Sequence, residues 1–359
     1  MLMIDSHLDI AWNALQWNRN LLQSVYTIRA QEAPLTEKGR GVGTVAFPDM
    51  RRGRMALAFA TVLARNTGTV VPNLDFGSPA QAYAIAQGHL AYYRALEHGG
   101  HIRIIADLNV LDTHMAEWQA WDAAHRDDTD QTPPLGFVIS MESADPILAP
   151  EQLGEWQAAG LRVIGPAHYG PGRYAGGTGT EAGLSPAGVR LVQEMDRLGV
   201  ILDMTHLSDQ AFWQSLDHYH RPVLASHNNC RALVAHQRQF SDEQLRAIIE
   251  RDGVIGAAFD IWMVVPGWNR GMPNKQASIE HVAAHIDHVC QLAGNSYHAA
   301  IGSDLDGGYG REQSPYDLDT IADMQQLTVI LAKRGFKEDD VAAIMHGNWV
   351  RLLRYAWER

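Results

Sequence analysis

Short apolar runs rich in Val, Ile and Ala alternate along this chain with longer amphipathic segments. The eight strongest runs are residues 2–5, 55–62, 136–141, 161–165, 200–203, 222–225, 253–258 and 299–302. Strands that are buried on both faces of a parallel sheet have this continuous apolar character, and helices connect them. Eight such units in succession predict an α/β fold, a (β/α)8 barrel of the TIM type.

Helices are predicted between the runs, at residues 80–96, 185–198, 209–216, 242–251, 279–292 and 318–334. Two of them begin with recognisable caps. Ser241 and Gln244 fit a capping box, and Ser185 precedes Pro186 at the first helical position. A ninth apolar run, residues 102–106, is left over, and we expect it to lie outside the barrel.

The length of 359 residues fits one large domain, because α/β barrels commonly exceed about 250 residues. Hydrophobic residues make up 46% of the chain, which is enough for a substantial core. The polar stretch 125–134 predicts a surface loop and the Gly-rich stretch 170–183 a flexible loop, and neither resembles a domain linker. We therefore predict a single barrel domain over residues 1–359 that ends in C-terminal helices.

Charge and composition exclude several classes of partner. A formal net charge of −12 disfavours nucleic acids, because neutralising phosphates requires clustered Lys and Arg. The longest apolar stretch, residues 55–64, is half as long as the roughly 20 residues that span a membrane. The first residues lack the basic region of a secretory signal, and Cys230 and Cys290 form no disulfide framework. We expect a cytoplasmic protein without a membrane or nucleic-acid partner, and a homodimer is compatible with the sequence.

Polar side chains that bind metals follow most of the runs. They are His7 and Asp9, Glu142, His168, His206, His227 and Asp304. In a parallel barrel the carboxyl ends of all strands lie on one face, and this is the face where such enzymes place their chemistry. We therefore expect these seven side chains to converge.

Imidazoles and carboxylates are natural ligands for Zn²⁺ and similar ions, and this number of them suits two ions. His7 and Asp9 lie two apart on an extended segment, so both side chains point the same way and can hold one ion. His206 and His227 can hold the second ion. Glu142 is predicted to bridge, because one carboxylate can give an oxygen to each of two ions about 3.5 to 4 Å apart.

A carboxylated lysine is the alternative bridge in some barrel hydrolases. The lysines are Lys38, Lys275, Lys333 and Lys337, and none follows a predicted strand. A glutamate bridge is therefore the better prediction.

Structural roles are the alternative for each polar residue. A histidine at a strand end can simply be hydrogen-bonded, and we expect this, or exposure to solvent, for His101, His114, His125, His218, His220, His281 and His285. Asp203 is expected to orient a metal-bound imidazole, as carboxylates around metal sites do, and Asp306 to cap the following turn. For Arg173 and Arg238 the default expectation is exposed surface.

Five segments carry a family resemblance. They are Asp5-Ser-His7-Leu-Asp9, Ser140-Met-Glu142, Asp203-Met-Thr-His206-Leu-Ser208, Ala225-Ser-His227-Asn-Asn-Cys-Arg231 and Gly302-Ser-Asp304-Leu-Asp306-Gly307. Together they resemble the metal-dependent dipeptidase family that includes renal (membrane) dipeptidase, and the match covers nearly the whole chain. The resemblance implies a barrel with two Zn²⁺ per chain that cleaves dipeptides, although other divalent ions also suit these ligands.

The resemblance also implies a role for each residue. His7 and Asp9 would bind one zinc ion, His206 and His227 the other, and Glu142 both. His168 matches the histidine that contacts the substrate, and Arg238 the arginine that binds the substrate carboxylate. Asp304 matches the acid that contacts the substrate amine and handles the leaving-group proton. His168 and Asp304 are therefore the predicted catalytic residues.

One position departs from the family pattern. After the seventh run the chain has Asp260, where the family often has an aromatic residue such as tyrosine. An additional acid here favours a positively charged group of the substrate, either its amino terminus or a basic side chain. We therefore expect Asp260 to contact the substrate.

The predicted function is hydrolysis of dipeptides that carry a free carboxylate, by a metal-activated water molecule. One alternative is another two-metal barrel amidohydrolase, acting on a cyclic amide, a lactone or an N-acyl amino acid. Another is a metal-binding barrel without catalysis. A serine hydrolase and a dinucleotide enzyme are disfavoured, because no Gly-x-Ser-x-Gly motif is present and no Gly-x-Gly-x-x-Gly motif follows an early strand.

Overall fold

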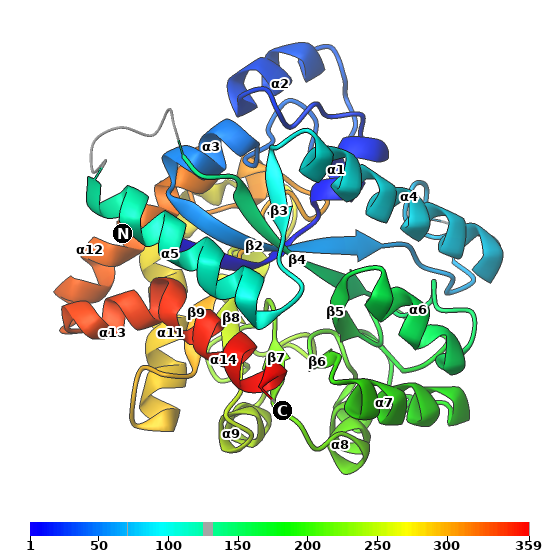
Figure 1. Cartoon of the computed structure of the whole chain (residues 1–359). Coiled ribbons are helices and arrows are strands. Elements are labelled where there is room, and N and C mark those ends of the chain that lie inside the picture. The colour runs from blue at the N-terminus through cyan, green and yellow to red at the C-terminus, as the bar shows by residue number, and fades with distance from the viewer. Residues whose placement is uncertain (70, 125–131, 359) are drawn as a thin grey trace.

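A computed structural model describes residues 1–69, 71–124 and 132–358 of the chain. Within these residues, eight parallel strands form a barrel wall in the order β1-β2-β4-β5-β6-β7-β8-β9, surrounded by helices (Figure 1). The strands are β1 (Met3–Leu8), β2 (Met55–Leu63), β4 (Leu135–Glu142), β5 (Leu161–Gly165), β6 (Ile201–Asp203), β7 (Val223–Ala225), β8 (Val254–Ala257) and β9 (Ala299–Ile301). The predicted α/β barrel is confirmed.

The ninth apolar run forms β3 (Ile102–Ile104), which lies off the barrel path and pairs with β4 alone. Ile102 is opposite Leu135 at the start of β4, whereas β5 pairs with β4 only from Ile139 onward. β3 and β5 therefore pair with successive parts of the same edge of β4. The prediction that this run lies outside the barrel is confirmed.

Side chains join the first and last strands of the barrel. The carboxylate of Asp5 accepts hydrogen bonds from the backbone N–H of Ser303 at 2.8 Å and from its hydroxyl at 2.5 Å. The hydroxyl of Ser6 donates to the carbonyl of Ile301 at 3.1 Å. These contacts hold β1 against the end of β9 and so fix the relative positions of the residues that follow both strands.

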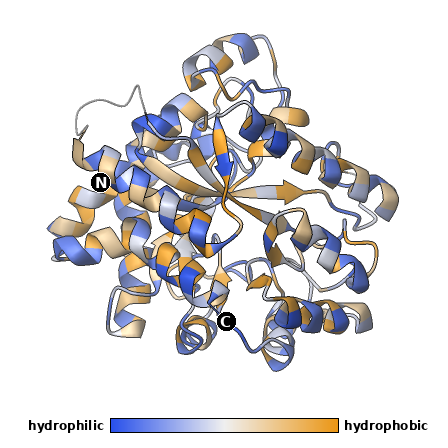
Figure 2. Cartoon of the chain, in the orientation of Figure 1, coloured by the Kyte–Doolittle hydropathy of each residue, from blue (hydrophilic) through white to orange (hydrophobic). Residues whose placement is uncertain are grey.

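Amphipathic helices cover the outside of the barrel. The longer ones are α4 (Pro79–His98), α5 (Leu108–Ala124), α7 (Pro186–Leu198), α8 (Asp209–His218), α9 (Asp242–Glu250), α11 (Ile279–Ala293), α12 (Gln326–Lys333) and α14 (Asn348–Trp357). Figure 2 shows hydrophobic colours along β2 and β4 and mixed colours on the surrounding helices, as expected when each helix buries one face. No helix among the described residues has the length and apolarity needed to span a membrane.

Six further helices are described. They are α1 (Ile10–Leu15), α2 (Val25–Glu32), α3 (Phe47–Arg52), α6 (Leu153–Ala158), α10 (Ile261–Val264) and α13 (Glu338–Ala342). Gln325, just before α12, donates to the carbonyl of Met1, so the amino terminus lies beside the carboxyl-terminal region (Figure 1).

The predicted caps are present. The hydroxyl of Ser185 accepts a hydrogen bond from the N–H of Gly188, and Ser241 forms a reciprocal capping box with Gln244. The predicted helix 318–334 is shorter and divided into a 3-10 segment, Ile321–Gln325, followed by α12. Most of the predicted surface loop 125–134 lies outside the described residues.

Asp306 supports the architecture in a way that the sequence did not predict. Its carboxylate accepts hydrogen bonds from the N–H of Thr44 at 2.7 Å, the N–H of Val45 at 3.1 Å and the guanidinium of Arg19 at 3.2 Å. Arg19 also pairs with both oxygens of Glu32. The expected role of the Asp306 side chain as a cap of its own turn was therefore wrong, because it connects the loop after β9 to a segment some 260 residues earlier.

Replacing Asp306 with Ala should lower the free energy of unfolding by about 3 to 5 kcal/mol, because Arg19 would remain buried with one charge partner removed. Urea denaturation of the variant and the parent protein measures this difference. Glu194 is the matched control, because it forms an exposed pair with Arg197 on α7. Its replacement with Ala should cost at most about 1 kcal/mol. Equal losses for the two variants would contradict a structural role of the Asp306 network.

Candidate active site

The seven predicted side chains meet at the carboxyl end of the barrel. His7 lies within β1, Asp9 precedes α1, and Glu142 is the last residue of β4. The other four follow the ends of four further strands, with His168 after β5, His206 after β6, His227 after β7 and Asp304 after β9. The strands β1 and β4 extend further than predicted, because Leu8 still pairs with Ala60 of β2 and Glu142 still pairs with Leu63 of β2.

Two groups of metal-binding atoms share one carboxylate. In the first group the Nε2 atom of His7 lies 4.0 Å from Asp9 Oδ1, 3.7 Å from Asp304 Oδ1 and 3.8 Å from Glu142 Oε2.

In the second group Glu142 Oε1 lies 3.2 Å from the Nε2 atom of His206 and 3.4 Å from that of His227. Oε2 of Glu142 therefore faces His7 and Oε1 faces His206 and His227, an arrangement that would let one carboxylate contact two ions.

The electrostatics of the cluster fit divalent cations. Burial raises the pKa of Asp9 to about 7 and lowers that of His7 to about 3. Burial, with the charges of Asp9 and Asp304, raises the pKa of Glu142 well above its usual range. Cations placed among these groups would favour their ligand forms, the ionised carboxylates and neutral imidazoles. Among the described residues, His7 Nε2 and Asp9 Oδ1 have no hydrogen-bond partner although both are buried, and metal coordination would satisfy them.

Hydroxyl groups orient two of the imidazoles. The Nδ1 atom of His206 lies 3.0 Å from the hydroxyl of Thr178, and that of His227 lies 2.9 Å from the hydroxyl of Ser226. A hydroxyl can accept a hydrogen bond from the Nδ1–H group. The lone pair of Nε2 is then directed at Glu142 and available to a metal.

Thr178 comes from the Gly-rich stretch that was predicted to be a flexible loop. This stretch is tied to the site by backbone hydrogen bonds, from Gly170 N–H to the Thr178 carbonyl and from Thr178 N–H to the His168 carbonyl, both at 2.9 Å. Because the hydroxyl of Thr178 also contacts His206, the stretch is a hydrogen-bonded support for His168 and for the predicted metal ligand His206.

Asp203 contacts the backbone of the two segments that carry the predicted metal ligands His206 and His227. Its carboxylate accepts hydrogen bonds at 3.0 Å from the N–H of Thr205, just before His206, and from the N–H of Ser226, just before His227. The expected contact with an imidazole is replaced by these backbone contacts. His206 itself has a left-handed backbone (φ +68°), which is rare for residues other than glycine and is typical of functional sites.

A cavity of about 360 Å³ opens above the cluster. Its walls include Asp9, Glu142, His168, Arg238, Asp260 and Asp304. Arg238 is buried, donating to the side chain of Asn228 at 2.6 Å and to the carbonyl of His227 at 2.8 Å. The default expectation of exposed surface was therefore wrong for Arg238. It was also wrong for Arg173, which is partly buried and donates to main-chain carbonyls, including that of Ile147.

Asp260 lies in the same cavity, and its carboxylate is already hydrogen-bonded. Gln313 donates to both of its oxygens and the indole of Trp262 to one of them. Burial raises the pKa of Asp260 to about 7, although Gln313 and the charge of Lys38 oppose this shift. Asp260 thus lines the cavity, with Lys38 and Arg270 on the same walls, and its contact with the substrate stays a prediction.

Sequence reasoning missed several residues that line the cavity. Arg65 follows β2, the barrel strand to which no site residue was assigned, and its guanidinium contacts His168. A polar residue directly after an apolar run was the signal that could have identified it. Lys38, Arg270 and Tyr309 come from loops, for which the sequence carried no comparable signal.

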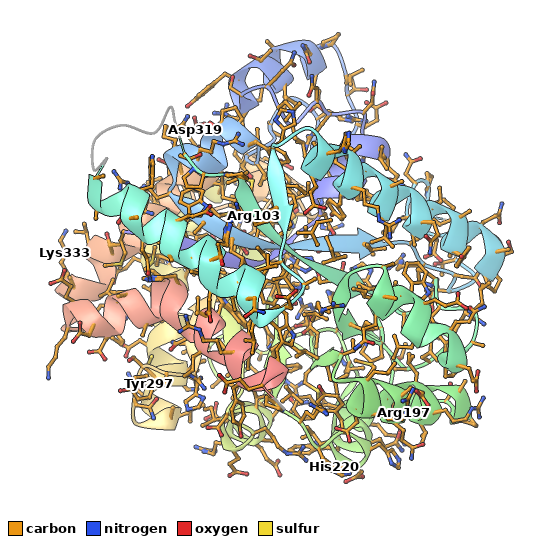
Figure 3. All side chains as sticks on the ribbon, viewed as in Figure 1. Arg103, Arg197, His220, Tyr297, Asp319 and Lys333 are labelled. Carbon is orange, nitrogen blue, oxygen red and sulfur yellow. The ribbon has the colours of Figure 1, made fainter. Side chains whose placement is uncertain are left out.

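The histidines expected to have no catalytic role are distributed as predicted where they are described. His114 and His285 are buried and hydrogen-bonded, to the carbonyl of Ala56 and to the N–H of Cys230 respectively. His220 lies at the surface, as do the labelled charged side chains Arg197 and Lys333 (Figure 3). His125 lies outside the described residues.

Comparison with known proteins identifies the family. The model of the family described as membrane dipeptidase (peptidase family M19) matches residues 1–358. Among curated proteins, dipeptidase AclJ of Aspergillus oryzae is 26% identical over a region covering 98% of this chain and 77% of its own. Dipeptidase TcpJ of Claviceps purpurea is 32% identical, but the region covers 54% of this chain and only 44% of TcpJ.

A solved structure supports the fold independently. A metallopeptidase from Rhodobacter sphaeroides, bound to a phosphinate mimic of the dipeptide L-Ala-D-Ala, has a TM-score of 0.76 and 23% identity, with 99% of each chain covered. The family model spans almost the entire sequence, so membership of the family does not depend on any single relative. The chain belongs to the membrane dipeptidase family, peptidase family M19, and is a metal-dependent dipeptidase with the α/β-barrel fold.

Proposed function

We propose that this protein hydrolyses dipeptides with a free carboxyl terminus, using two zinc ions held at the carboxyl end of the barrel. The observation that carries the proposal is the position of Glu142, whose Oε2 faces His7 while its Oε1 faces His206 and His227. A site for a single ion would not need a buried carboxylate shared between two groups of ligands.

The residues divide between the ions as follows. His7 and Asp9 hold one ion, His206 and His227 hold the other, and Glu142 contacts both. When bound, the two ions polarise the peptide carbonyl and lower the pKa of a water molecule from 15.7 toward about 7. The same nitrogen and oxygen ligands suit other divalent ions, so zinc is the proposed ion among several that fit.

Arg238 binds the substrate carboxylate. Its Nη1 and Nη2 atoms are held by Asn228 and by the carbonyl of His227, which fixes the guanidinium in the cavity wall. Its Nε atom is buried without a partner among the described residues, so an N–H donor remains for a ligand. A planar guanidinium that is held in place in this way suits a carboxylate.

His168 and Asp304 act on the bond that breaks. As water adds to the carbonyl carbon, His168 donates a hydrogen bond to the oxygen that becomes negative. Asp304 contacts the substrate amine and carries a proton to the departing nitrogen as the C–N bond breaks. Asp304 is held at φ +59°, a strained conformation that fixes its carboxylate beside His7.

The relatives support dipeptides as the substrate class. Several are named dipeptidases, and the Rhodobacter sphaeroides enzyme binds a mimic of L-Ala-D-Ala. A cytoplasmic location and a homodimer stay predictions from the sequence.

Comparing one dipeptide with its carboxyl-amidated form tests the proposed specificity. Hydrolysis should be at least about 30-fold slower for the amide, because the charged pair with Arg238 would be lost. Equal rates would overturn the carboxylate requirement. Faster hydrolysis of a cyclic amide, a lactone or an N-acyl amino acid than of any dipeptide would instead favour the other class of amidohydrolase.

Replacing Asp260 with Asn should selectively slow substrates whose amino terminus or basic side chain approaches this carboxylate. The size of the amino acid is preserved, so the change removes mainly the negative charge. Steady-state kinetics with a dipeptide panel that differs in the charge of the first residue measures the effect. Unchanged kcat/KM for every member of the panel would remove Asp260 from the substrate contacts.

A further inference from the structure

Arg65 contacts His168, the predicted substrate-binding histidine. It is 4% exposed and lies two residues after β2, where its Nη1 atom is 2.9 Å from Nδ1 of His168. Its Nη2 atom lies 2.6 Å from Oδ2 of Asp75. Asp75 in turn accepts hydrogen bonds from the N–H and the hydroxyl of Thr67. The guanidinium is therefore held between a buried carboxylate and an imidazole.

This contact determines which nitrogen of His168 carries the proton. A guanidinium has only donors, so Nδ1 of His168 must be the acceptor. A neutral imidazole has one N–H, which then lies on Nε2. The Nε2 atom is the one that faces the metal cluster, 3.7 Å from Glu142 Oε1.

The neighbouring histidines have the opposite arrangement. In His206 and His227, Nδ1 lies against a hydroxyl that can accept a proton, and Nε2 is left with a lone pair for a metal. The ring centroids of His168 and His206 are 4.4 Å apart, so distance alone would allow His168 to be another metal ligand. The contact of Arg65 with Nδ1 distinguishes His168 from the predicted ligands. The proton then lies on Nε2, and a protonated nitrogen cannot coordinate a metal ion.

We propose that Arg65 is a positioning residue that holds His168 as an Nε2–H donor to the reacting carbonyl oxygen and prevents it from binding metal. This inference rests on the proposed function, which gives His168 its substrate contact. It adds that Arg65 is the residue that makes His168 the hydrogen-bond donor in this contact.

The loop that carries Arg65 is braced for this role. The backbone N–H of Arg65 donates to the carbonyl of Leu74 at 2.9 Å. The carbonyl of Arg65 accepts a hydrogen bond from the N–H of Phe76 at 2.8 Å. The next residue, Asn66, donates its N–H to Asp145 at 2.8 Å. A donor held in place before the reaction does not have to reorganise as charge develops on the carbonyl oxygen.

A double-mutant cycle tests the inference, with the variants Arg65→Met, His168→Ala and the pair together. In the parent background, Arg65→Met should lower kcat by about 10- to 100-fold with KM changed by less than about threefold. In the His168→Ala background Arg65→Met should lower kcat by less than about twofold, because Arg65 acts on the reaction only by positioning His168. Inhibition by a phosphinate dipeptide mimic should weaken by the same factor as kcat, since its tetrahedral oxygens resemble those of the transition state.

Arg65→Lys is the conservative control, because an ammonium is also only a donor and should recover part of the lost kcat. Zinc content and thermal unfolding of each variant show whether the fold and the metal site are intact, and the cycle is run with Arg65→Lys if Arg65→Met does not fold. Equal losses in both backgrounds, or an effect on KM alone, would overturn the role of Arg65 while leaving His168 in place. Full activity of His168→Ala would overturn both assignments, whereas failure of all dipeptides in the parent protein would overturn the proposed function.

Discussion

Replacing Glu142 with Gln is expected to lower kcat by about a thousandfold, equivalent to about 4 kcal/mol of transition-state stabilisation. An amide has one oxygen acceptor, whereas the two oxygens of Glu142 face separate ligand groups. The variant should therefore also bind less than two zinc ions per chain. Metal analysis of the purified protein and steady-state kinetics on one dipeptide measure the two effects.

Glu151 is the matched control for Glu142, because its side chain is 71% exposed at the protein surface. Its replacement with Gln should leave zinc content and kcat unchanged. An E142Q variant that keeps both ions and the parent kcat would contradict the bridging role.

Replacing Arg238 with Met is expected to lower kcat/KM for dipeptides by at least about 30-fold, because a buried charge pair with the substrate costs about 2 to 5 kcal/mol when one partner is removed. For carboxyl-amidated dipeptides the same variant should change kcat/KM by less than about threefold, since no charge pair forms with these substrates. Kinetics of the parent and the variant on both substrate forms measure this selectivity.

Two controls separate substrate binding from damage to the site. Arg246, exposed on α9, is the matched arginine, and R246M should leave both substrate forms unaffected. Arg238 also holds the carbonyl of His227, so zinc content of R238M must equal that of the parent protein. Equal losses for the free and amidated dipeptides would show that Arg238 supports the metal site and does not bind the carboxylate.

The sequence predicted the barrel and the convergence of its polar residues for one physical reason. Parallel strands bring their carboxyl ends to one face, so residues far apart in the chain, such as His7 and His227, could be placed together without knowing any contact. The division of these residues between two ions followed from their types and spacing. This division stays a prediction, and the position of Glu142, with Oε2 toward His7 and Oε1 toward His206 and His227, supports it.

Features that depend on side-chain contacts could not be predicted in this way. Nothing in the sequence indicated that Asp203 would hold the backbone before His206 and His227, or that Asp306 would reach Thr44 across the fold. The proton position on His168 depends on its contact with Arg65, which lies 103 residues earlier in the chain. Such contacts are fixed by packing of loops, whose conformations carry no periodic signal in the sequence.

Restoring zinc to the metal-stripped protein tests whether hydrolysis requires two metal ions. The rate of hydrolysis of a stereochemically defined dipeptide panel is measured while Zn²⁺ is added in steps from zero to three equivalents per chain. We expect no hydrolysis before addition and a rate that reaches its plateau at two equivalents. Hydrolysis that survives full metal removal would contradict this expectation.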